Sequence, residues 1–306
     1  MKILFTGASS FTGFWFVKKL AAAGHEIVCP VTGALDKYAD VRKRRVEQLT
    51  SLCRFVPNAP FGSENFLALA GAEKFDLLCH HAAEMTNYRS PDFDALRALQ
   101  NNSLNVCAVL KILQCPVLLT GSVFENDEGA GDEPLRAFSP YGLSKGLTFQ
   151  FFRHYCHGAG VPLGKFVIPN PFGPFEEPRF TAFLMKTWKA GQPSEVKTPD
   201  YVRDNIQVDL LALAYADFCR EVAGTKAALP KSNPSGYVET QGQFVQRAAR
   251  ETQVRTGWRC ELKFAKQTDF SEPMHRTNTE PAANHFPSWN ESGAWDAFVE
   301  YYSTLR

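Results

Sequence analysis

The sequence lacks several features that would place it outside the cytoplasm or give it a metal. No run approaches the roughly 18 uninterrupted apolar residues of a membrane-spanning helix. The first expected strand begins at Lys2, which leaves no space for a signal peptide, so we expect a cytoplasmic protein. Its eight cysteines show no C-x-x-C pair and no metal-ligand spacing, which indicates reduced, mostly buried thiols and no metal site.

The sequence also lacks an excess of charge of either sign. Its net charge of +1 provides no electrostatic reason to expect nucleic acid or a membrane surface as a partner. Repeats and low-complexity linkers are absent as well. A chain of 306 residues with 44% hydrophobic residues is long and apolar enough to bury a large core.

The start of the chain has the pattern of a dinucleotide-binding βα unit. A short apolar strand runs into a turn of small residues, then into an apolar helix, and a second strand follows at Glu26–Val31. Gly7 permits the tight turn, Gly13 lets the helix lie close to the strand, and the backbone N–H groups between them face a pyrophosphate. The expected cofactor-binding residues here are Gly7, Ser9, Ser10, Phe11, Thr12 and Gly13.

Tyr141 and Lys145 lie four residues apart and therefore share one face of a helix. A tyrosine with a pKa of about 10 needs a fall of roughly 3 units, or about 4 kcal/mol, to work near pH 7. One charge roughly 4 Å away, at an effective dielectric of about 20, supplies about 4 kcal/mol. This spacing predicts a catalytic pair, and its position far downstream of the glycine-rich turn strengthens that interpretation.

Together, the turn and the Y-x-x-x-K pair resemble the short-chain dehydrogenase/reductase superfamily, in particular its extended branch of nucleotide-sugar epimerases, dehydratases and reductases. The resemblance spans most of the chain. Gly7 and Gly13 match two of the three glycines of the extended fingerprint, and Ser10 replaces the middle one. The resemblance implies that Tyr141 and Lys145 are catalytic and also contact the cofactor.

Further segments match the same branch. His80, with Ala82 and Ala83, looks like the H-x-A-A segment that passes beneath the cofactor, and Asn102 matches the structural and proton-relay asparagine. The resemblance makes Thr120 the catalytic hydroxyl, because it stands three residues before a valine-aromatic pair. Ser122 competes for this role and is otherwise a substrate contact, since strand alternation places both hydroxyls on one face.

The second half of the chain resembles the sugar-nucleotide pocket of the branch. Asn170 begins a segment whose asparagine contacts the diphosphate or sugar, and Arg203 begins an R-D-N-I-Q-V-D run whose arginine holds the diphosphate. Arg276 corresponds to a second, later arginine, and two guanidinium groups suit a diphosphate. Glu84 falls in a stretch similar to that of the dehydratases, and we place it at the substrate.

Alternating strands and helices through about residue 168 predict an α/β fold, a Rossmann-type doubly wound parallel sheet with a smaller C-terminal α/β substrate-binding subdomain. We assign 1–168 and about 201–224 to the dinucleotide-binding domain, and 169–200 and 225–306 to the sugar-nucleotide-binding subdomain. One helix is expected over Asp92–Leu113 and another over Tyr141–Gly158. The last helix, near Glu291–Leu305, presents core rather than site residues.

The expected substrate is a nucleotide-diphosphate sugar, oxidised to a transient 4-keto sugar by an NAD(P)-dependent enzyme. Epimerisation is the leading interpretation and NADPH-dependent reduction of a 4-keto sugar the next. A 4,6-dehydratase ranks third, because Gly121 and Ser122 stand where such enzymes carry an acidic pair. A non-catalytic dinucleotide sensor is the hypothesis from another class, and it commonly loses the tyrosine or lysine present here.

The cofactor is NAD or NADP. NAD-binding proteins usually place an acid at the end of the second strand, whereas this chain has Thr32, which we place at the cofactor, then Gly33, with Asp36 slightly late. The basic run 42–45 is expected on the exposed face of the next helix, in the region where a 2′-phosphate would sit.

A homodimer is the expected assembly. In relatives, the helices corresponding to 92–113 and 141–158 pack against their copies, and the second of these is strongly apolar here.

Overall fold

The computed structural model describes residues 1–225, 229–270 and 272–305, which form two compact units. The first unit comprises 1–128, 134–168 and 212–233, and the second comprises 129–133, 169–211 and 234–306. Residues 201–211, which the sequence analysis assigned to the dinucleotide-binding domain, lie in the second unit. The reason is that strand β10 (Val202–Gln207) pairs with strands of that unit.

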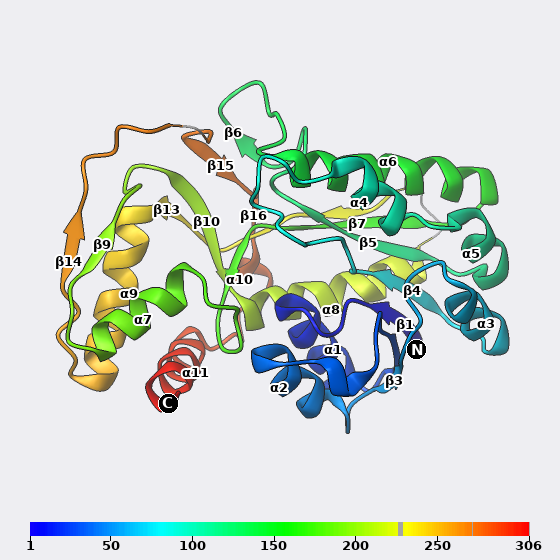
Figure 1. Cartoon of the computed structure of the whole chain (residues 1–306), viewed down its shortest axis with the longest axis horizontal. Helices are drawn as coiled ribbons and strands as arrows, with labels where there is room; N and C mark the ends of the chain where they lie inside the picture. Colours follow the sequence, from blue (N-terminus) through cyan, green and yellow to red (C-terminus); the bar gives the residue numbers. More distant parts are fainter. Residues whose placement is uncertain (226–228, 271, 306) are drawn as a thin grey trace. The chain divides into compact units, whose positions relative to one another are not determined.

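The first unit is built on a parallel sheet of seven strands in the order β11-β7-β5-β4-β1-β2-β3 (Figure 1). The strands are β1 (Lys2–Thr6), β2 (Glu26–Pro30), β3 (Arg54–Val56), β4 (Leu77–His80), β5 (Val117–Ser122), β7 (Leu163–Ile168) and β11 (Lys231–Ser232). The chain builds outward from β1 in one direction and then in the other, which is the doubly wound arrangement. The predicted Rossmann-type fold class is confirmed.

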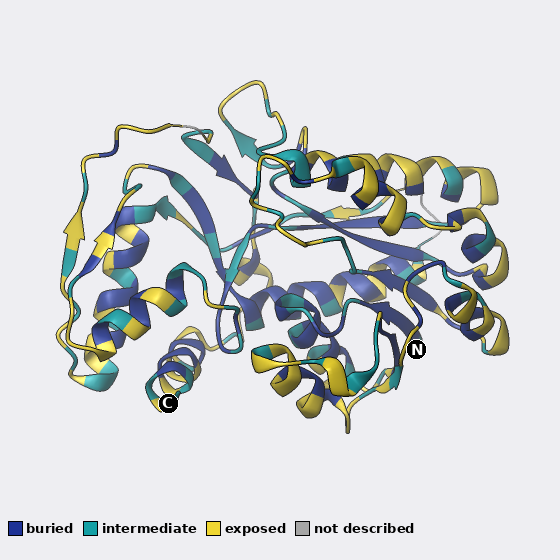
Figure 2. Ribbon diagram, viewed as in Figure 1, coloured by how far each residue is buried: buried dark blue, intermediate teal, exposed yellow. Residues whose placement is uncertain are grey.

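Helices cover both faces of this sheet (Figure 1). One face carries α1 (Phe11–Ala22), the short η1 (Leu35–Lys37), α2 (Asp40–Leu49) and α8 (Val208–Gly224), whose first residues belong to the second unit. The other carries α3 (Glu64–Ala72), α4 (Ala95–Asn102), α5 (Val106–Leu113) and α6 (Pro140–Ala159). Because both faces are covered, the inner strands are largely buried (Figure 2). Ile3, Leu4 and Phe5 of β1 are fully buried.

The prediction of one helix over 92–113 is wrong, because the segment forms two helices, α4 and α5. The chain leaves α4 after Asn102, and Asn105 takes a left-handed conformation with φ of 51° before α5 begins. Asparagine tolerates positive φ better than most residues. Its side chain donates to the carbonyl of Gly62 at 2.8 Å, which holds the break in place.

Helix α6 has both of its ends specified by the local sequence. Ser139 is its N-cap and accepts from the N–H of Gly142, and Pro140 occupies the first turn. Gly160 ends the helix with φ of 66°. These caps set the position of Tyr141 in the first turn and of Lys145 one turn later.

The second unit has a five-stranded sheet in the order β13-β10-β15-β6, with β8 also paired to β10. Its elements are β6 (Ala130–Gly131), β8 (Asn170–Phe172), α7 (Phe180–Lys189), β9 (Ser194–Val196), β10 (Val202–Gln207), β12 (Pro234–Ser235), β13 (Tyr237–Thr240), α9 (Gln241–Thr256), β14 (Leu262–Phe264), β15 (His275–Thr277), β16 (Glu280–Pro281), α10 (Ala282–His285) and α11 (Glu291–Thr304). Trp295, Phe298, Val299 and Tyr302 of α11 are buried in the core of this unit. The prediction that the last helix carries core residues is confirmed.

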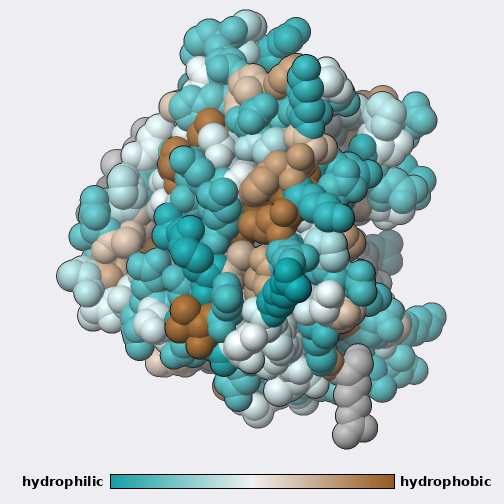
Figure 3. Space-filling model, turned by 90° about the vertical axis from the view of Figure 1, so that its left-hand side faces the viewer, coloured by the Kyte–Doolittle hydropathy of each residue, from teal (hydrophilic) through white to brown (hydrophobic). Residues whose placement is uncertain are grey.

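The surface drawn in Figure 3 is mostly hydrophilic, with separate hydrophobic patches. The exposed apolar side chains of the second unit come from different elements, namely Phe183, Val238, Val254, Phe264 and Phe270. Scattered exposed apolar residues of this kind are ordinary on a folded protein.

Candidate active site

The glycine-rich turn after β1 requires glycine at two positions. Gly7 has φ of 85°, and a Cβ there would lie 2.8 Å from the backbone nitrogen of Ala82. A Cβ on Gly13 would lie 2.2 Å from the carbonyl oxygen of Gly7. The N–H groups of Phe11 and Thr12, at the start of α1, have no carbonyl acceptor within the helix. The turn therefore has the close backbone packing and the free donors that a pyrophosphate requires.

Ser10, the departure from the glycine fingerprint, is accommodated by capping α1. Its hydroxyl donates to the carbonyl of Gly7 at 2.8 Å and accepts from the N–H of Gly13 at 3.1 Å. The side chain is therefore folded back into the turn, as for an N-cap serine.

His80 connects the turn to α4 from beneath. Its Nε2 lies 2.9 Å from the carbonyl oxygen of Asn102 and its Nδ1 lies 3.0 Å from the hydroxyl of Thr6, which also accepts from the N–H of Ala82. Burial lowers the pKa of His80 to about 3, so the ring is neutral. Nε2 then donates to the carbonyl and Nδ1 accepts from Thr6, and this arrangement positions Ala82 and Ala83 beside the turn.

His81, which the sequence analysis did not select, joins the turn to the candidate catalytic threonine. Its Nε2 lies 3.1 Å from Ser10 Oγ and 3.0 Å from Thr12 Oγ1, and its Nδ1 lies 3.1 Å from Thr120 Oγ1. Burial, assisted by the charge of Lys145, lowers the pKa of His81 to about 3. Position x of an H-x-A-A motif carries no signal in a single sequence, so only the fold reveals this residue.

The tautomer of His81 follows from the hydrogen bonds of Ser10. The only hydroxyl hydrogen of Ser10 goes to the carbonyl of Gly7, so Ser10 accepts from His81 and Nε2 carries the proton. A neutral ring then has a bare Nδ1, which accepts the hydroxyl hydrogen of Thr120. The lone pairs of Thr120 are the part of its hydroxyl left to accept another hydrogen bond.

Thr120 and Ser122 stay the two candidates for the catalytic hydroxyl. Thr120 is buried, with 3% of its surface exposed. Ser122 is half-buried, and its hydroxyl accepts from the N–H of Phe124 at 3.2 Å. The structure thus shows a local partner for each, and Thr120 remains our choice.

Tyr141 and Lys145 project from the start of α6. The ring of Tyr141 is packed edge-on by Tyr88 and Phe93, with centroid distances of 5.4 and 5.9 Å. Lys145 is buried, and its Nζ donates to the carbonyl oxygen of Thr120 at 2.5 Å. Burial lowers the pKa of Lys145 to about 8, Glu125 opposes this effect, and the ammonium is mostly protonated at pH 7.

A buried ion cluster lies behind the end of β5, and sequence reasoning missed it. Lys165 Nζ is 2.6 Å from a carboxylate oxygen of Glu125 and 2.6 Å from one of Glu128. A Cβ on Gly121 would lie 2.7 Å from Lys165 Cε and 2.9 Å from Glu125 Oε1. A side chain at position 121 would therefore require the ends of the buried Lys165 and Glu125 side chains to shift.

Asn102 and Glu84 are hydrogen-bonded to each other and to nearby residues of the loop after β4 and of α6. Asn102 Oδ1 accepts from the N–H of Glu84 at 2.8 Å, and its Nδ2 donates to Thr148 of α6 at 3.3 Å. Hydrogen bonds from the Thr86 side chain and N–H, and smaller ones from Asn101 and the Met85 N–H, lower the pKa of Glu84. Both side chains shape the loop after β4, and their roles in proton relay and substrate binding stay predictions.

The three site residues predicted from the second half of the chain lie in the second unit. Arg203 and Arg276 are register partners on the adjacent strands β10 and β15, so the structure brings them together. Arg203 donates to the carbonyls of residues 202, 273 and 274 and pairs with Glu272 at 2.8 Å, while Arg276 is fully buried. The Nδ2 of Asn170 is buried and has no partner among the residues that the structure describes. Their roles in binding a diphosphate or sugar stay predictions.

The basic run was expected on an exposed helix face; this is confirmed for residues 42–44, which are exposed, and wrong for Arg45. Arg45 is fully buried and donates to the carbonyl of Ser9 at 3.1 Å, and Arg42 donates to the hydroxyl of Ser9 at 2.8 Å. Both side chains reach from α2 to the turn after β1. Thr32 is exposed at the end of β2.

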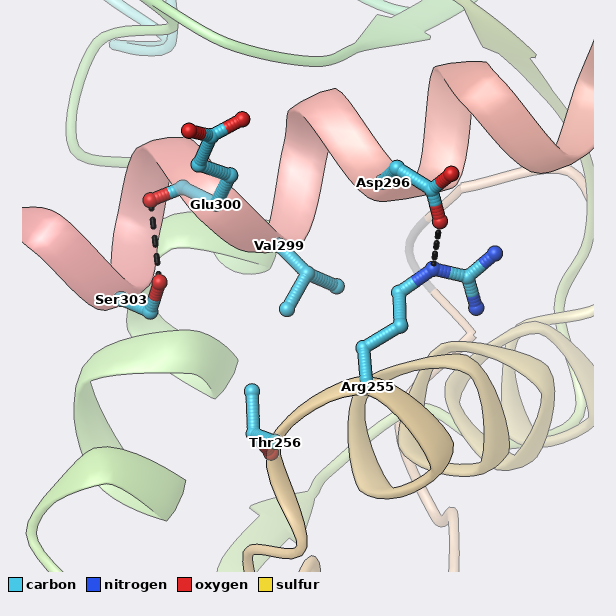
Figure 4. A pocket seen from close by; sticks show the side chains of 6 residues that line it. All are labelled: Arg255, Thr256, Asp296, Val299, Glu300 and Ser303. Carbon is cyan, nitrogen blue, oxygen red and sulfur yellow. Dashed lines mark hydrogen bonds and ion pairs between the residues drawn. The ribbon is translucent and has the colours of Figure 1, made fainter.

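A hollow of about 330 Å³ between α9 and α11 lies apart in the sequence from every predicted site residue (Figure 4). Arg255, at its edge, is paired with Asp296 and Glu251. The other lining residues are Thr256, Val299, Glu300 and Ser303. The ion pair of Arg255 with Asp296 joins α9 to α11, and the residues that line the hollow form no recognisable catalytic or ligand-binding group.

Within the ranges that the structure covers, no three His, Cys, Asp or Glu side chains are placed to hold a metal ion. None of the helices described has the length and apolar character needed to cross a membrane.

Residues 3–225 match the sequence model of the NAD dependent epimerase/dehydratase family. The chain belongs to this family. It is accordingly an NAD(P)-dependent enzyme of the extended short-chain dehydrogenase/reductase type, as the resemblance predicted. The glycine-rich turn, with its close packing and free N–H groups, fits the dinucleotide that the family uses.

Solved structures of similar fold include nucleotide-sugar enzymes. UDP-glucuronic acid 4-epimerase from Bacillus cereus, in complex with UDP-glucuronic acid and NAD, has 18% identity and a TM-score of 0.72, with 100% of both chains covered. UDP-glucose 4-epimerase from Thermotoga maritima, with UDP-glucose, has 18% identity and a TM-score of 0.74, with 99% of this chain and 98% of that one covered. dTDP-glucose 4,6-dehydratase from Bacillus anthracis, in complex with NAD, has 14% identity and a TM-score of 0.74, covering 100% and 97%. At these identities the likeness establishes the fold.

Replacing Gly13 with alanine is expected to weaken dinucleotide binding by at least about 10-fold and to lower the thermal unfolding temperature. The new methyl would lie 2.2 Å from the Gly7 carbonyl oxygen, so the turn must open. Titration with NAD and NADP, beside a thermal melt, measures both effects. Gly158→Ala is the control, because nothing lies within 4 Å of a Cβ there. Unchanged binding by Gly13→Ala would show that the turn does not hold the dinucleotide.

Proposed function

We propose that the protein is a nucleotide-sugar epimerase acting through a transient 4-keto sugar. The observation that carries the proposal is the buried Lys145, which donates to the Thr120 carbonyl one helical turn after Tyr141, in the same unit as the glycine-rich turn. These residues bring a general base, a cation and a hydroxyl to the carboxyl edge of the sheet, where α/β enzymes of this type bind their ligands.

Tyr141, Lys145 and Thr120 have different roles in the proposed reaction. Tyr141 takes the proton of the C4 hydroxyl, and the ammonium of Lys145 lowers the pKa of the phenol and binds the ribose hydroxyls. Thr120 donates a hydrogen bond to the reacting oxygen after its hydroxyl hydrogen turns away from His81 Nδ1. A bound nicotinamide would supply reversible hydride transfer at C4, so that the ketone could be reduced again from its opposite face. Tyr141 then returns the proton, so the sugar is inverted at C4 with no net oxidation.

The substrate of the proposal is a nucleotide-diphosphate sugar. It is supported by Arg203 and Arg276 on adjacent strands and by the unpartnered amide of Asn170. Glu84 and Ser122 stay proposed substrate-binding residues. A diphosphate at Arg203 replaces its bond to the half-exposed Glu272, which costs little because that carboxylate is solvated.

We rank two related reactions below epimerisation. NADPH-dependent reduction of a 4-keto sugar is the second candidate. Arg42 and Arg45 contact the turn and no acid ends β2, and these features favour NADP(H), which such a reductase uses. Dehydration is disfavoured, because Gly121 and Ser122 stand where dehydratases carry an acidic pair.

The test begins with the dinucleotide that the purified protein releases on denaturation. The protein is then incubated with UDP- and dTDP-hexoses and hexuronic acids, and the products are identified by NMR. We expect a retained dinucleotide and interconversion of one pair of C4 epimers without added cofactor. Turnover only with added NADPH and a 4-keto sugar would instead assign the reductase, and a 4-keto-6-deoxy product would assign the dehydratase.

The proposed assembly is a homodimer. Leu143, Leu147 and Phe151 are exposed at successive turns of α6, with 43%, 39% and 41% of their surfaces accessible. Ile112 of α5 is also exposed, and α5 packs beside α6. A second copy would cover this apolar face. Light scattering after gel filtration, with Leu147→Glu as the disrupting variant, tests the assembly.

A further inference from the structure

Two arginines of α2 reach the same residue of the glycine-rich turn. Arg42 Nη2 donates to the hydroxyl of Ser9 at 2.8 Å, and Arg45 Nη1 donates to the carbonyl of Ser9 at 3.1 Å. Ser9 is buried, with 5% of its surface exposed. The turn that receives the dinucleotide therefore has a guanidinium group at its edge and a second one supporting its backbone.

The guanidinium of Arg42 is held in place by its neighbours without being paired to any carboxylate that the structure describes. Its guanidinium carbon lies 5.2 Å from the ring centroid of Tyr38, which orients the group. Among the residues that the structure describes, no carboxylate forms an ion pair with Arg42. The adjacent Lys43 is directed elsewhere, 3.9 Å from Glu47 on the same helix.

The end of β2 lacks the group that selects NAD. Because β1 and β2 are parallel neighbours, the turn after β1 and the residues after β2 lie at the same edge of the sheet. An acid at this point binds the ribose 2′-hydroxyl of NAD, and an arginine accommodates the 2′-phosphate of NADP. Here the positions are Thr32, which is exposed, and Gly33, whose Cβ direction is open. The first acid is Asp36, in η1.

We propose that Arg42 and Ser9 bind the 2′-phosphate of NADP(H), and that the enzyme therefore selects NADP(H) over NAD(H). A guanidinium binds a phosphate through paired, charge-assisted hydrogen bonds, which are stronger than those to a neutral hydroxyl. Arg45 is a positioning residue that holds the Ser9 backbone. The inference shares the dinucleotide turn with the proposed function and does not depend on which sugar reacts.

The test uses protein freed of its retained dinucleotide and compares binding with and without the 2′-phosphate. Dissociation constants are measured for NADPH and NADH, and for adenosine 2′,5′-bisphosphate and 5′-AMP, which contain no nicotinamide. We expect the phosphorylated member of each pair to bind at least about 10-fold more tightly, with the advantage falling as salt is raised. Arg42→Gln is expected to remove most of this advantage while NADH binding stays within about 2-fold.

Lys43→Gln is the matched control, because it removes a neighbouring cation of α2 that is directed away from the turn. Equal or tighter binding of NADH by the unmodified enzyme would overturn the proposal. So would an Arg42→Gln variant that weakens NADPH and NADH alike, since that result assigns Arg42 to the fold of the turn. Loss of NADH binding alone in Asp36→Asn would show selection of NAD through Asp36. A protein inactive on every nucleotide sugar would refute the proposed function and leave these binding results unaffected.

Discussion

Replacing Tyr141 with phenylalanine is expected to lower turnover by at least about 10³-fold while dinucleotide binding changes by no more than about 2-fold. General acid–base catalysis by one positioned side chain contributes about 10²–10⁴-fold, and Tyr141 is the proposed base and acid in both halves of the reaction. Phenylalanine keeps the ring contacts with Tyr88 and Phe93, so the variant loses the hydroxyl and little else.

The measurement is the rate of epimer interconversion, with the dissociation constant of the dinucleotide as the second readout. Tyr155→Phe is the control, because Tyr155 lies on the same helix and is half-buried but belongs to no predicted site. Tyr155→Phe should retain full activity. An active Tyr141→Phe enzyme would contradict the mechanism, whereas loss of dinucleotide binding in that variant would indicate damage to the fold.

Replacing Lys145 with methionine is the second large change, with turnover expected to fall by at least about 10²-fold. The variant removes the cation that acidifies Tyr141 and a donor for the cofactor ribose. In the unmodified enzyme, burial lowers the pKa of Lys145 from its ordinary 10.5 to about 8. The ammonium is therefore lost as the pH rises through about 8, and activity should fall with an inflection there.

Unlike turnover, the stability of the folded protein should not fall in Lys145→Met. A folded-state pKa of about 8 means that the fold binds this proton more weakly than the unfolded chain does, so the charged lysine costs the fold about 3 kcal/mol at pH 7. Methionine removes that cost and loses the hydrogen bond to Thr120, which is worth about 1.5–3 kcal/mol. We expect the thermal unfolding temperature of Lys145→Met to be unchanged or higher.

The pH–rate profile and a thermal melt test this prediction together. Lys111→Met, at an exposed position of α5, is the control and should leave both unchanged. An unmodified enzyme with no alkaline inflection between about pH 7 and 9 would contradict the assignment of Lys145. Strong destabilisation of Lys145→Met would instead make the lysine a structural residue.

Local features of the fold were predictable because each depends on neighbouring residues. The small residues between Gly7 and Gly13 specify a turn, and the spacing of Tyr141 and Lys145 specifies one helix face. The alternation of strands and helices predicted the doubly wound sheet. The break at Asn105 was missed, because a single left-handed residue leaves the apolar period on both sides nearly intact.

Contacts between distant residues were not predictable in this way. His81 meets Thr120, 39 residues later, and Lys165 meets Glu125, 40 residues earlier. Neither pair has a fixed spacing or a periodic pattern. Their approach depends on which strands are neighbours and on how far each side chain reaches.

The sequence by itself determined the family, the sheet and the positions of Tyr141 and Lys145, because sequence-local spacing and helical period carry that information. Tertiary structure alone decided that Thr120 is hydrogen-bonded to His81, that the ends of Lys165 and Glu125 lie against Gly121, and that Arg42 contacts the turn at Ser9. These are packing outcomes. A side chain acquires such a partner only when parallel strands bring residues far apart in the chain to one edge of the sheet.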